Sequence, residues 1–240
     1  MDPRSHPPGL QQTEERAIER FSGPTRHARL RPEERERQIV DGAVEYFSAV
    51  GFGGDTRELA KRLGVTQPLL YRYFATKDAL IERVFEEVFM GRWDPAWESI
   101  VADRTITLRE RLLSFYKDYA RTLLERGWIR IFMYAGLKGA TINERFLTII
   151  RERIILTLAA EVRHEYGLPS PDEVCLDELE IELLIGINSR IIYMAIRKWI
   201  YGMDVTTASV TSILEATIDV FLAGVPSVLR EFVKPTGADA

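Results

Sequence analysis

Cysteine and histidine are scarce in this sequence of 240 residues, which has one cysteine, Cys175, and three histidines. A single cysteine excludes an internal disulfide and a cysteine-rich zinc site, and it favours a reducing, cytoplasmic setting. Excess charge is also lacking, since 32 basic and 36 acidic residues leave a formal net charge of -4. This balance excludes a uniformly basic coat for nucleic acid but allows a local basic patch. With 46% hydrophobic and 28% charged residues, the chain is predicted to be a soluble globular protein.

Long apolar runs are missing as well. Residues 1–20 are polar and charged, so we expect no secretory signal there. The most apolar long stretch, residues 181–202, is interrupted by Arg190, Arg197 and Lys198. We therefore expect a core helix of a soluble protein in this stretch, and no transmembrane span.

Signatures of common catalytic sites are absent too. The sequence has no Gly-x-Ser-x-Gly elbow, and the glycines of residues 51–54 lack the third glycine of a dinucleotide-binding fingerprint. A di-iron site in a helical bundle needs two Glu-x-x-His pairs, and only Glu161 and His164 have that spacing. We therefore expect no enzyme, no cofactor and no metal site, with a helical-bundle enzyme as the remote alternative.

Residues 1–31 form a predicted N-terminal arm, because they are rich in proline and glycine and poor in large apolar residues. Residues 21–32 include Arg26, Arg29 and Arg31 and no acidic residue. Two interpretations are open: a solvated tail, or a basic arm that reaches the phosphate backbone or the minor groove of DNA.

Four helices are predicted after this arm, over residues 32–50, 55–63 and 66–74 and from residue 76 onward. Pro32, followed by acidic residues, marks the start of the first helix, and Gly51 supplies its left-handed stop. Asp55, Thr66 and Thr76 are suitable N-caps for the other three helices. The two short central helices, joined by a tight turn, predict a helix-turn-helix whose second short helix enters a DNA major groove.

Local charge supports DNA binding by this segment. Residues 55–77 contain five basic residues against two acidic ones, a net charge of +3 in a chain that totals -4. The basic patch therefore coincides with the predicted helix-turn-helix.

A dense pattern of apolar and glycine residues runs through the same segment. It comprises Ile39, Ala43, Phe47, Gly51 and Phe52, followed by Leu59, Ala60, Leu63, Gly64, Val65, Thr66, Leu70, Tyr71, Tyr73, Phe74, Lys77 and Leu80. This pattern resembles the DNA-binding domain of TetR/AcrR-type repressors over about 50 of the 240 residues. The segment between Gly51 and Leu59 departs from the family pattern, being one residue shorter and having Asp55 at the cap.

The remaining chain shows helical periods and no strand-like alternation. We expect helices over about residues 108–123, 128–137, 142–154, 172–201 and 206–223. The predicted fold is all-α, with an N-terminal three-helix helix-turn-helix DNA-binding domain (32–78) and a C-terminal helical domain (79–232). The resemblance implies that the second domain binds an effector and dimerises, and residues 233–240 are a predicted tail.

Several side chains are candidates for DNA contact. Gln67 can pair with adenine in the major groove, and Leu69 can touch a thymine methyl group. Hydroxyl and ammonium groups near the short third helix suit phosphates instead. The predicted DNA-binding residues are Arg57, Thr66, Gln67, Pro68, Leu69, Tyr71, Arg72, Tyr73 and Lys77. The alternatives are exposed helix residues without a partner and, for Tyr71, an ordinary core position.

The last two predicted helices are apolar on more than one side. Resemblance to the family implies that they pair with their copies in a four-helix bundle, giving a two-fold dimer. The predicted interface residues are Leu183, Ile187, Ile191, Met194, Leu214, Ile218 and Phe221. The alternative is that both helices are buried within one subunit.

Aromatic residues are concentrated in the middle helices, where they suit a pocket for a small organic effector. The candidate lining residues are Trp93, Tyr116, Trp128, Phe132, Tyr134 and Asn188. Plain core packing is the alternative for the aromatic residues, whereas Asn188 is a polar residue that interrupts an apolar helix and needs a partner.

Together, these features predict a cytoplasmic, ligand-responsive repressor that binds a palindromic operator as a homodimer. An effector that changes the angle of the fourth helix would change the spacing of the two recognition helices and release DNA. An activator and a ligand-independent DNA-binding regulator of the same fold are the alternatives. The expected partners are operator DNA, a second copy of the chain and an unidentified small organic effector, with no membrane.

Overall fold

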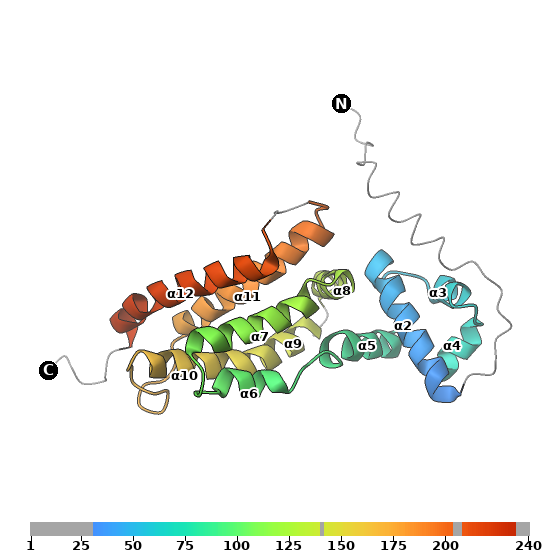
Figure 1. Ribbon diagram of the computed structural model, residues 1–240. Coiled ribbons are helices and arrows are strands. Elements are labelled where there is room, and N and C mark those ends of the chain that lie inside the picture. The colour runs from blue at the N-terminus through green and yellow to red at the C-terminus, as the bar shows by residue number, and fades with distance from the viewer. Residues whose placement is uncertain (1–30, 140–141, 204–207, 234–240) are drawn as a thin grey trace. The chain divides into compact units, whose positions relative to one another are not determined.

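The computed structural model describes residues 31–139, 142–203 and 208–233, and every regular element within these ranges is a helix, as predicted (Figure 1). Except for Arg31, the predicted N-terminal arm lies outside the described residues, as does the tail beyond Val233. Contacts divide the chain into an N-terminal unit and a C-terminal unit, with the boundary between Val84 and Phe85.

The N-terminal unit contains the four predicted helices. They are α2 (Pro32–Val50), α3 (Thr56–Arg62), α4 (Gln67–Tyr73) and α5 (Lys77–Phe85). The predicted caps are confirmed: the Asp55 carboxylate accepts the Arg57 amide, and the Thr66 hydroxyl accepts the Leu69 amide. Gly64, in the turn between α3 and α4, has a φ of +64°, which a residue with a Cβ rarely adopts.

Close packing fixes α3 against α2. Ile39, Phe47 and Leu59 are fully buried between the helices. Leu63 approaches α2 at Gly42, where an added Cβ would lie 2.2 Å from Leu63 Cδ2. A side chain at position 42 would therefore displace the Leu63 side chain.

The C-terminal unit is a bundle of longer helices. Its elements are the π-helical turn η1 (Glu86–Met90), α6 (Ala96–Ala102), α7 (Leu108–Leu123), α8 (Arg126–Leu137), α9 (Ile142–Ile150), the π-helical turn η2 (Arg151–Ile155), α10 (Leu156–Glu165), α11 (Glu178–Trp199) and α12 (Val210–Phe232). The sequence pattern did not predict α6 or the two π-helical turns. Helices α7, α11 and α12 pack side by side.

Helix α11 begins six residues later than the predicted start at residue 172. The Arg163 guanidinium donates hydrogen bonds to the carbonyl oxygens of Pro169, Val174 and Cys175, which holds this segment in a non-helical turn. Asp177 then caps the helix, and its side chain accepts the Leu179 amide. The late start therefore depends on a contact from α10 that helical periodicity does not reveal.

Helix α12 continues beyond the predicted end at residue 223, although Pro226 lies inside it. A proline has no N–H, so the carbonyl four residues earlier loses its helical partner. The Tyr166 hydroxyl donates to that carbonyl, on Leu222, at 2.9 Å. The Tyr166 side chain thus replaces the missing backbone donor and lets the helix continue.

The segment Val210–Glu231 is long and apolar enough, by length and composition alone, to cross a membrane. Two acidic side chains of α12 nevertheless pair with α7. Asp219 lies 2.6 Å from Arg109, and Glu215 lies 3.4 Å from Lys117. These ion pairs, with Leu214 and Ile218 fully buried among the other helices, place α12 in the bundle.

The replacement of a backbone donor by Tyr166 can be tested. Tyr166→Phe should lower the free energy of unfolding by about 1 kcal/mol, because the Leu222 carbonyl loses its partner. In a Pro226→Ala background the same change should cost less, because the restored N–H at position 226 donates to Leu222. Denaturant unfolding of the four proteins measures this coupling, and an equal loss in both backgrounds would contradict it.

Candidate nucleic-acid interface

The start of α3 is joined to the recognition helix α4 through one hydroxyl group. The Thr56 Oγ1 atom accepts a hydrogen bond from Gln67 Nε2 at 3.1 Å and lies 3.0 Å from the Tyr71 hydroxyl. Thr56 is 5% exposed, and Tyr71 is 37% exposed. Two predicted DNA-binding side chains are therefore held in place by a buried residue that they share.

Helix α5 is joined to the loop before α3. The Lys77 ammonium donates to the Gly54 carbonyl at 2.6 Å, and the Tyr46 hydroxyl donates to the neighbouring Asp55 carbonyl at 3.1 Å. An ammonium has three donors, so Lys77 keeps others for a phosphate. The same lysine can thus fix the loop and bind DNA.

The predicted DNA-binding residues lie on or beside the helix-turn-helix. Arg57, Thr66, Pro68, Tyr71 and Arg72 are exposed, whereas Gln67, Leu69, Tyr73 and Lys77 are half-buried. The sequence analysis missed Thr56 and Gly54 as supporting groups. Thr56 is the first residue of α3, where a threonine hydroxyl can reach the next helix, but no local spacing indicates which side chain it meets.

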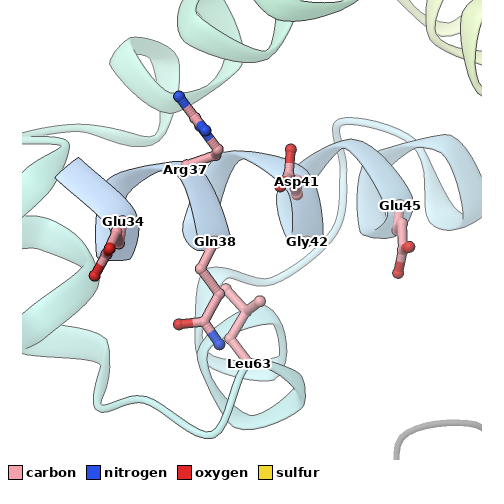
Figure 2. A pocket seen from close by; sticks show the side chains of 7 residues that line it. All are labelled: Glu34, Arg37, Gln38, Asp41, Gly42, Glu45 and Leu63. Atoms are coloured by element: carbon pink, nitrogen blue, oxygen red, sulfur yellow. The ribbon is translucent and has the colours of Figure 1, made fainter. Parts of the chain in front are cut away.

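A hollow of about 330 Å³ lies on another part of this unit, between α2 and Leu63. Figure 2 shows Gln38 directed toward Leu63, with Arg37 and Asp41 on the opposite side of the helix. The lining residues are Glu34, Arg37, Gln38, Asp41, Gly42, Glu45 and Leu63. Three carboxylates against one guanidinium make this hollow unfavourable for a phosphate backbone.

Four of the six candidate effector residues, Trp93, Tyr116, Trp128 and Phe132, fall into two aromatic groups of the C-terminal unit. Trp128 stacks on Phe132 with ring centroids 5.0 Å apart and also contacts Phe89 and Phe146. We call Phe85, Phe89, Trp128, Phe132 and Phe146 the Trp128 cluster. Trp93, Trp97, Phe115, Tyr116 and Tyr119 form the second group, the Trp97 cluster.

The candidate effector residues differ in their exposure to solvent. Tyr116, Trp128 and Asn188 are buried, and Trp93, Phe132 and Tyr134 are half-buried. The Tyr134 hydroxyl accepts a hydrogen bond from Arg130 at 2.9 Å. Burial raises the pKa of the Tyr116 phenol above its usual value, so Tyr116 stays protonated and can donate a hydrogen bond. The sequence analysis did not include Phe85 or Phe89, which precede the middle helices.

The predicted dimer residues need correction, because most of them lie in the core of the subunit. Ile187, Ile191, Met194, Leu214 and Ile218 are at most 7% exposed, and Leu183 and Phe221 are half-buried. Both helices are apolar on two sides, and periodicity does not say which side packs inward. Their exposed residues include Gly186, Ser189, Arg190, Tyr193, Ala216, Val220, Ala223, Gly224, Ser227 and Val228.

Glu161, which has the Glu-x-x-His spacing with His164, forms ion pairs with two arginines. Glu161 binds Arg111 at 2.6 Å and Arg104 at 2.8 Å. Hydrogen bonds from Arg104 and then Arg111 lower the pKa of the Glu161 carboxyl. Its carboxylate therefore serves as the shared anion of two arginines.

The geometry of α3, α4 and their turn defines a helix-turn-helix DNA-binding domain. Residues 39–84 match the family model described as bacterial regulatory proteins, tetR family. This segment of the chain is therefore similar to the DNA-binding domain of that family.

Curated relatives are similar over about a third of the chain. The tetracycline repressor protein class A of Escherichia coli, from transposon 1721, is 35% identical over 91 residues, which are 35% of this chain and 42% of that protein. The class H tetracycline repressor of Photobacterium damsela subsp. piscicida is 33% identical over 94 residues, which are 36% of this chain and 43% of that protein. The matched segment thus spans about two fifths of these relatives.

Solved structures resemble the fold over more of the chain. A TetR-like transcriptional regulator from Rhodococcus sp. RHA1 has a TM-score of 0.61 and 20% identity, covering 82% of this chain and 100% of that one. The TetR family regulator PfmR from Thermus thermophilus has a TM-score of 0.56 and 20% identity, covering 78% and 97%. These similar proteins are regulators, in agreement with the expectation that this chain is not an enzyme.

Removal of the Thr56 hydroxyl tests whether this group positions the side chains of Gln67 and Tyr71 on α4. Thr56→Val should weaken binding to a selected operator by about tenfold, because Gln67 and Tyr71 lose their common partner. Thr217→Val removes a hydroxyl from α12 and should leave operator affinity unchanged. Fluorescence anisotropy measures both, and unchanged affinity of the Thr56 variant would show that its hydroxyl does not position these side chains.

Proposed function

We propose that this chain is a ligand-responsive transcriptional repressor that binds a palindromic operator as a homodimer in the cytoplasm. The observation that carries the proposal is the Thr56 contact, which presents Gln67 and Tyr71 on a short helix in a locally basic segment. The match of residues 39–84 to the tetR family model supports DNA binding by this segment.

In this proposal, Gln67 reads a base and the surrounding side chains bind phosphates. Gln67 donates one N–H to Thr56, which leaves its carbonyl oxygen and its second N–H for the edge of an adenine. Arg57 and Arg72 are exposed and charged, and Thr66 lies at the N-terminus of α4. These three residues suit the phosphate backbone.

The proposed dimer uses the outer sides of α11 and α12. Val220 is 75% exposed and Val228 is 36% exposed, although both are apolar. Ala216, Ala223 and Gly224 are small, so a helix of a second copy can approach closely. Pairing of this surface with its copy would form a four-helix bundle and hold two recognition helices for a two-fold operator.

The proposed effector site lies among the middle helices and uses Trp93, Tyr116, Trp128, Phe132, Tyr134 and Asn188. An effector that binds the DNA-free state more tightly must lower operator affinity by the same coupling free energy. Release of a bound operator by a ligand would support repression by this route. Sequencing DNA fragments retained by the purified protein, and then screening compounds that release them, tests the whole proposal.

Base reading and phosphate contact make different predictions. Gln67→Ala should weaken operator binding by about 1 to 3 kcal/mol and relax the preference at one base pair. Arg72→Ala should weaken binding evenly across sequences and reduce the slope of log K against log salt by about one. Titrations on specific and random DNA at several salt concentrations measure both. Equal losses on both DNAs for Gln67→Ala would remove its reading role.

A single acidic substitution tests whether the outer surface of α12 forms the dimer interface. Val220→Glu should give monomers that bind operator weakly, because a buried unpaired carboxylate is unfavourable in a dimer interface. Leu137→Glu is the matched control, since Leu137 is 81% exposed on α8 and lies outside the proposed interface. Sedimentation velocity measures the assembly, and an intact dimer of the Val220 variant would place the interface elsewhere. By contrast, Ile187→Glu should unfold the subunit, because Ile187 is 3% exposed within it.

A further inference from the structure

The hollow of about 330 Å³ beside α2 has an apolar floor and a largely acidic wall. Its floor is formed by Gly42, which has no side chain, and by Leu63, which is buried. Asp41 and Glu45 lie one helical turn apart on its wall, and both are exposed. Like charges at this spacing repel each other. A cation placed between these two carboxylates would therefore remove an unfavourable interaction.

Two other charged residues line the hollow. Glu34 already accepts hydrogen bonds from the Arg31 amide and guanidinium. Arg37 lies one turn before Asp41, so it can offset one of the two remaining negative charges. Glu45 has no cation one turn away, since positions 41, 42, 48 and 49 are Asp, Gly, Ser and Ala. Over residues 31–139, 142–203 and 208–233, neither Asp41 nor Glu45 takes part in an ion pair.

The sequence supplies a basic segment directly before α2. Residues 24–31 contain Arg26, Arg29 and Arg31 and no acidic residue. Residues 24–30 lie outside the described residues, and Arg31 is the N-cap of α2. A segment whose charge complements the hollow is thus covalently attached beside it. Exposed ion pairs are weak one by one, but attachment within reach gives a high effective concentration.

The reach of this segment matches the length of the hollow. An extended chain advances about 3.3 Å per residue, whereas a helix rises about 1.5 Å per residue. Arg26 can therefore lie up to about 16 Å from Arg31. Measured along α2 from Arg31, Asp41 lies at about 15 Å and Glu45 at about 21 Å. A segment that runs back along α2 would bring the Arg26 guanidinium between these two carboxylates.

Gln38 suits a peptide segment in the same hollow. Figure 2 shows its side chain directed toward Leu63. Its Oε1 atom accepts a hydrogen bond from Arg35 at 2.6 Å, and its Nε2 atom donates to no acceptor among the described residues. An amide nitrogen has two donors, which an extended chain can meet with its carbonyl oxygens. A phosphate backbone would instead be repelled by the neighbouring carboxylates.

We propose that residues 24–30 bind in the hollow beside α2 of the same chain, with Arg26 between Asp41 and Glu45. The segment then has two alternative partners, α2 and DNA. Phosphates compete with the two carboxylates for the same guanidinium, so the bound segment lowers the affinity for random DNA. The contact within the chain does not depend on the proposed repressor function.

Trypsin cleavage after Arg29 of the full chain measures this contact, because a bound segment is cleaved more slowly. Asp41→Asn with Glu45→Gln should raise the initial cleavage rate at least about threefold at low salt. Glu152→Gln with Glu165→Gln changes the net charge equally at exposed positions of the C-terminal unit and should leave the rate unchanged. Circular dichroism checks that both variants are folded. Equal cleavage rates of the two variants overturn the proposal.

A charge exchange tests the pairing of Arg26. Arg26→Glu should raise the cleavage rate after Arg29, because the glutamate is repelled by Asp41 and Glu45. Adding Asp41→Lys and Glu45→Lys should lower the rate again, because opposite charges then meet in reversed order. Both proteins have the same residue near the cleaved bond, so the preference of trypsin itself cancels. The same rate in both overturns the pairing.

Dilution distinguishes binding within one chain from binding between chains. At a fixed trypsin concentration, a contact within the chain gives a cleavage rate constant that is independent of protein concentration. A rate constant that falls as the protein concentration rises would mean that the segment binds a second copy, and it would overturn the contact within the chain.

Competition with DNA is measured by titration of a random duplex at low salt. Asp41→Asn with Glu45→Gln should bind at least about twofold more tightly than the Glu152 and Glu165 variant, because the freed Arg26 reaches a phosphate. Adding Arg26→Gln should abolish this gain. A gain that persists without Arg26 would come from direct repulsion between α2 and DNA, and it would overturn the competition. If no variant binds DNA, the proposed function fails while the cleavage results still decide the contact.

Discussion

The buried pair of Arg163 and Glu180 fixes the position of α11, on which much of the C-terminal unit depends. The two side chains are 1% and 2% exposed, and burial of two charges is favourable only when their remaining hydrogen bonds are satisfied. Arg163 meets this condition by binding three carbonyls of the turn before α11, and Glu180 accepts the Asp177 amide at the start of the helix. One ion pair therefore joins the end of α10, the turn and the first turn of α11. The level of Asn188 in the bundle follows from it.

Sequence patterns predicted the N-terminal unit well because its determinants are local. Asp55 and Thr66 cap the helix that each precedes, and Gly64 needs only its own backbone conformation. The bounds of α11 and the length of α12 were predicted wrongly, because Arg163 and Tyr166 act on them from another helix. The side of α11 that faces inward was also misplaced, since apolar residues lie on two sides of it. Thr56 was missed because its partners lie 11 and 15 residues away.

The two units differ in whether the polar side chains of their proposed sites have hydrogen-bond partners. In the N-terminal unit, Gln67 and Tyr71 contact Thr56, so less side-chain freedom would be lost in the proposed binding of DNA. In the C-terminal unit, Tyr116 and Trp128 keep buried groups without partners. In the proposed effector site, such groups would gain hydrogen bonds from a ligand and would discriminate against compounds that lack the matching atom. Rigid presentation thus suits recognition of a fixed surface, and unsatisfied groups suit chemical selection.

The contact between Lys77 and Gly54 has a mechanical consequence for α5. Because its first residue is fastened to the loop before α3, the beginning of this helix cannot turn without displacing the segment that carries Thr56. Its other end passes directly into the π-helical turn of Glu86–Met90, where the regular hydrogen-bond spacing is interrupted. Helices bend more easily at such interruptions than within regular turns. Helix α5 is therefore fixed to the loop before α3 at its beginning and continues at its end into an irregular turn that contains Phe89 of the Trp128 cluster.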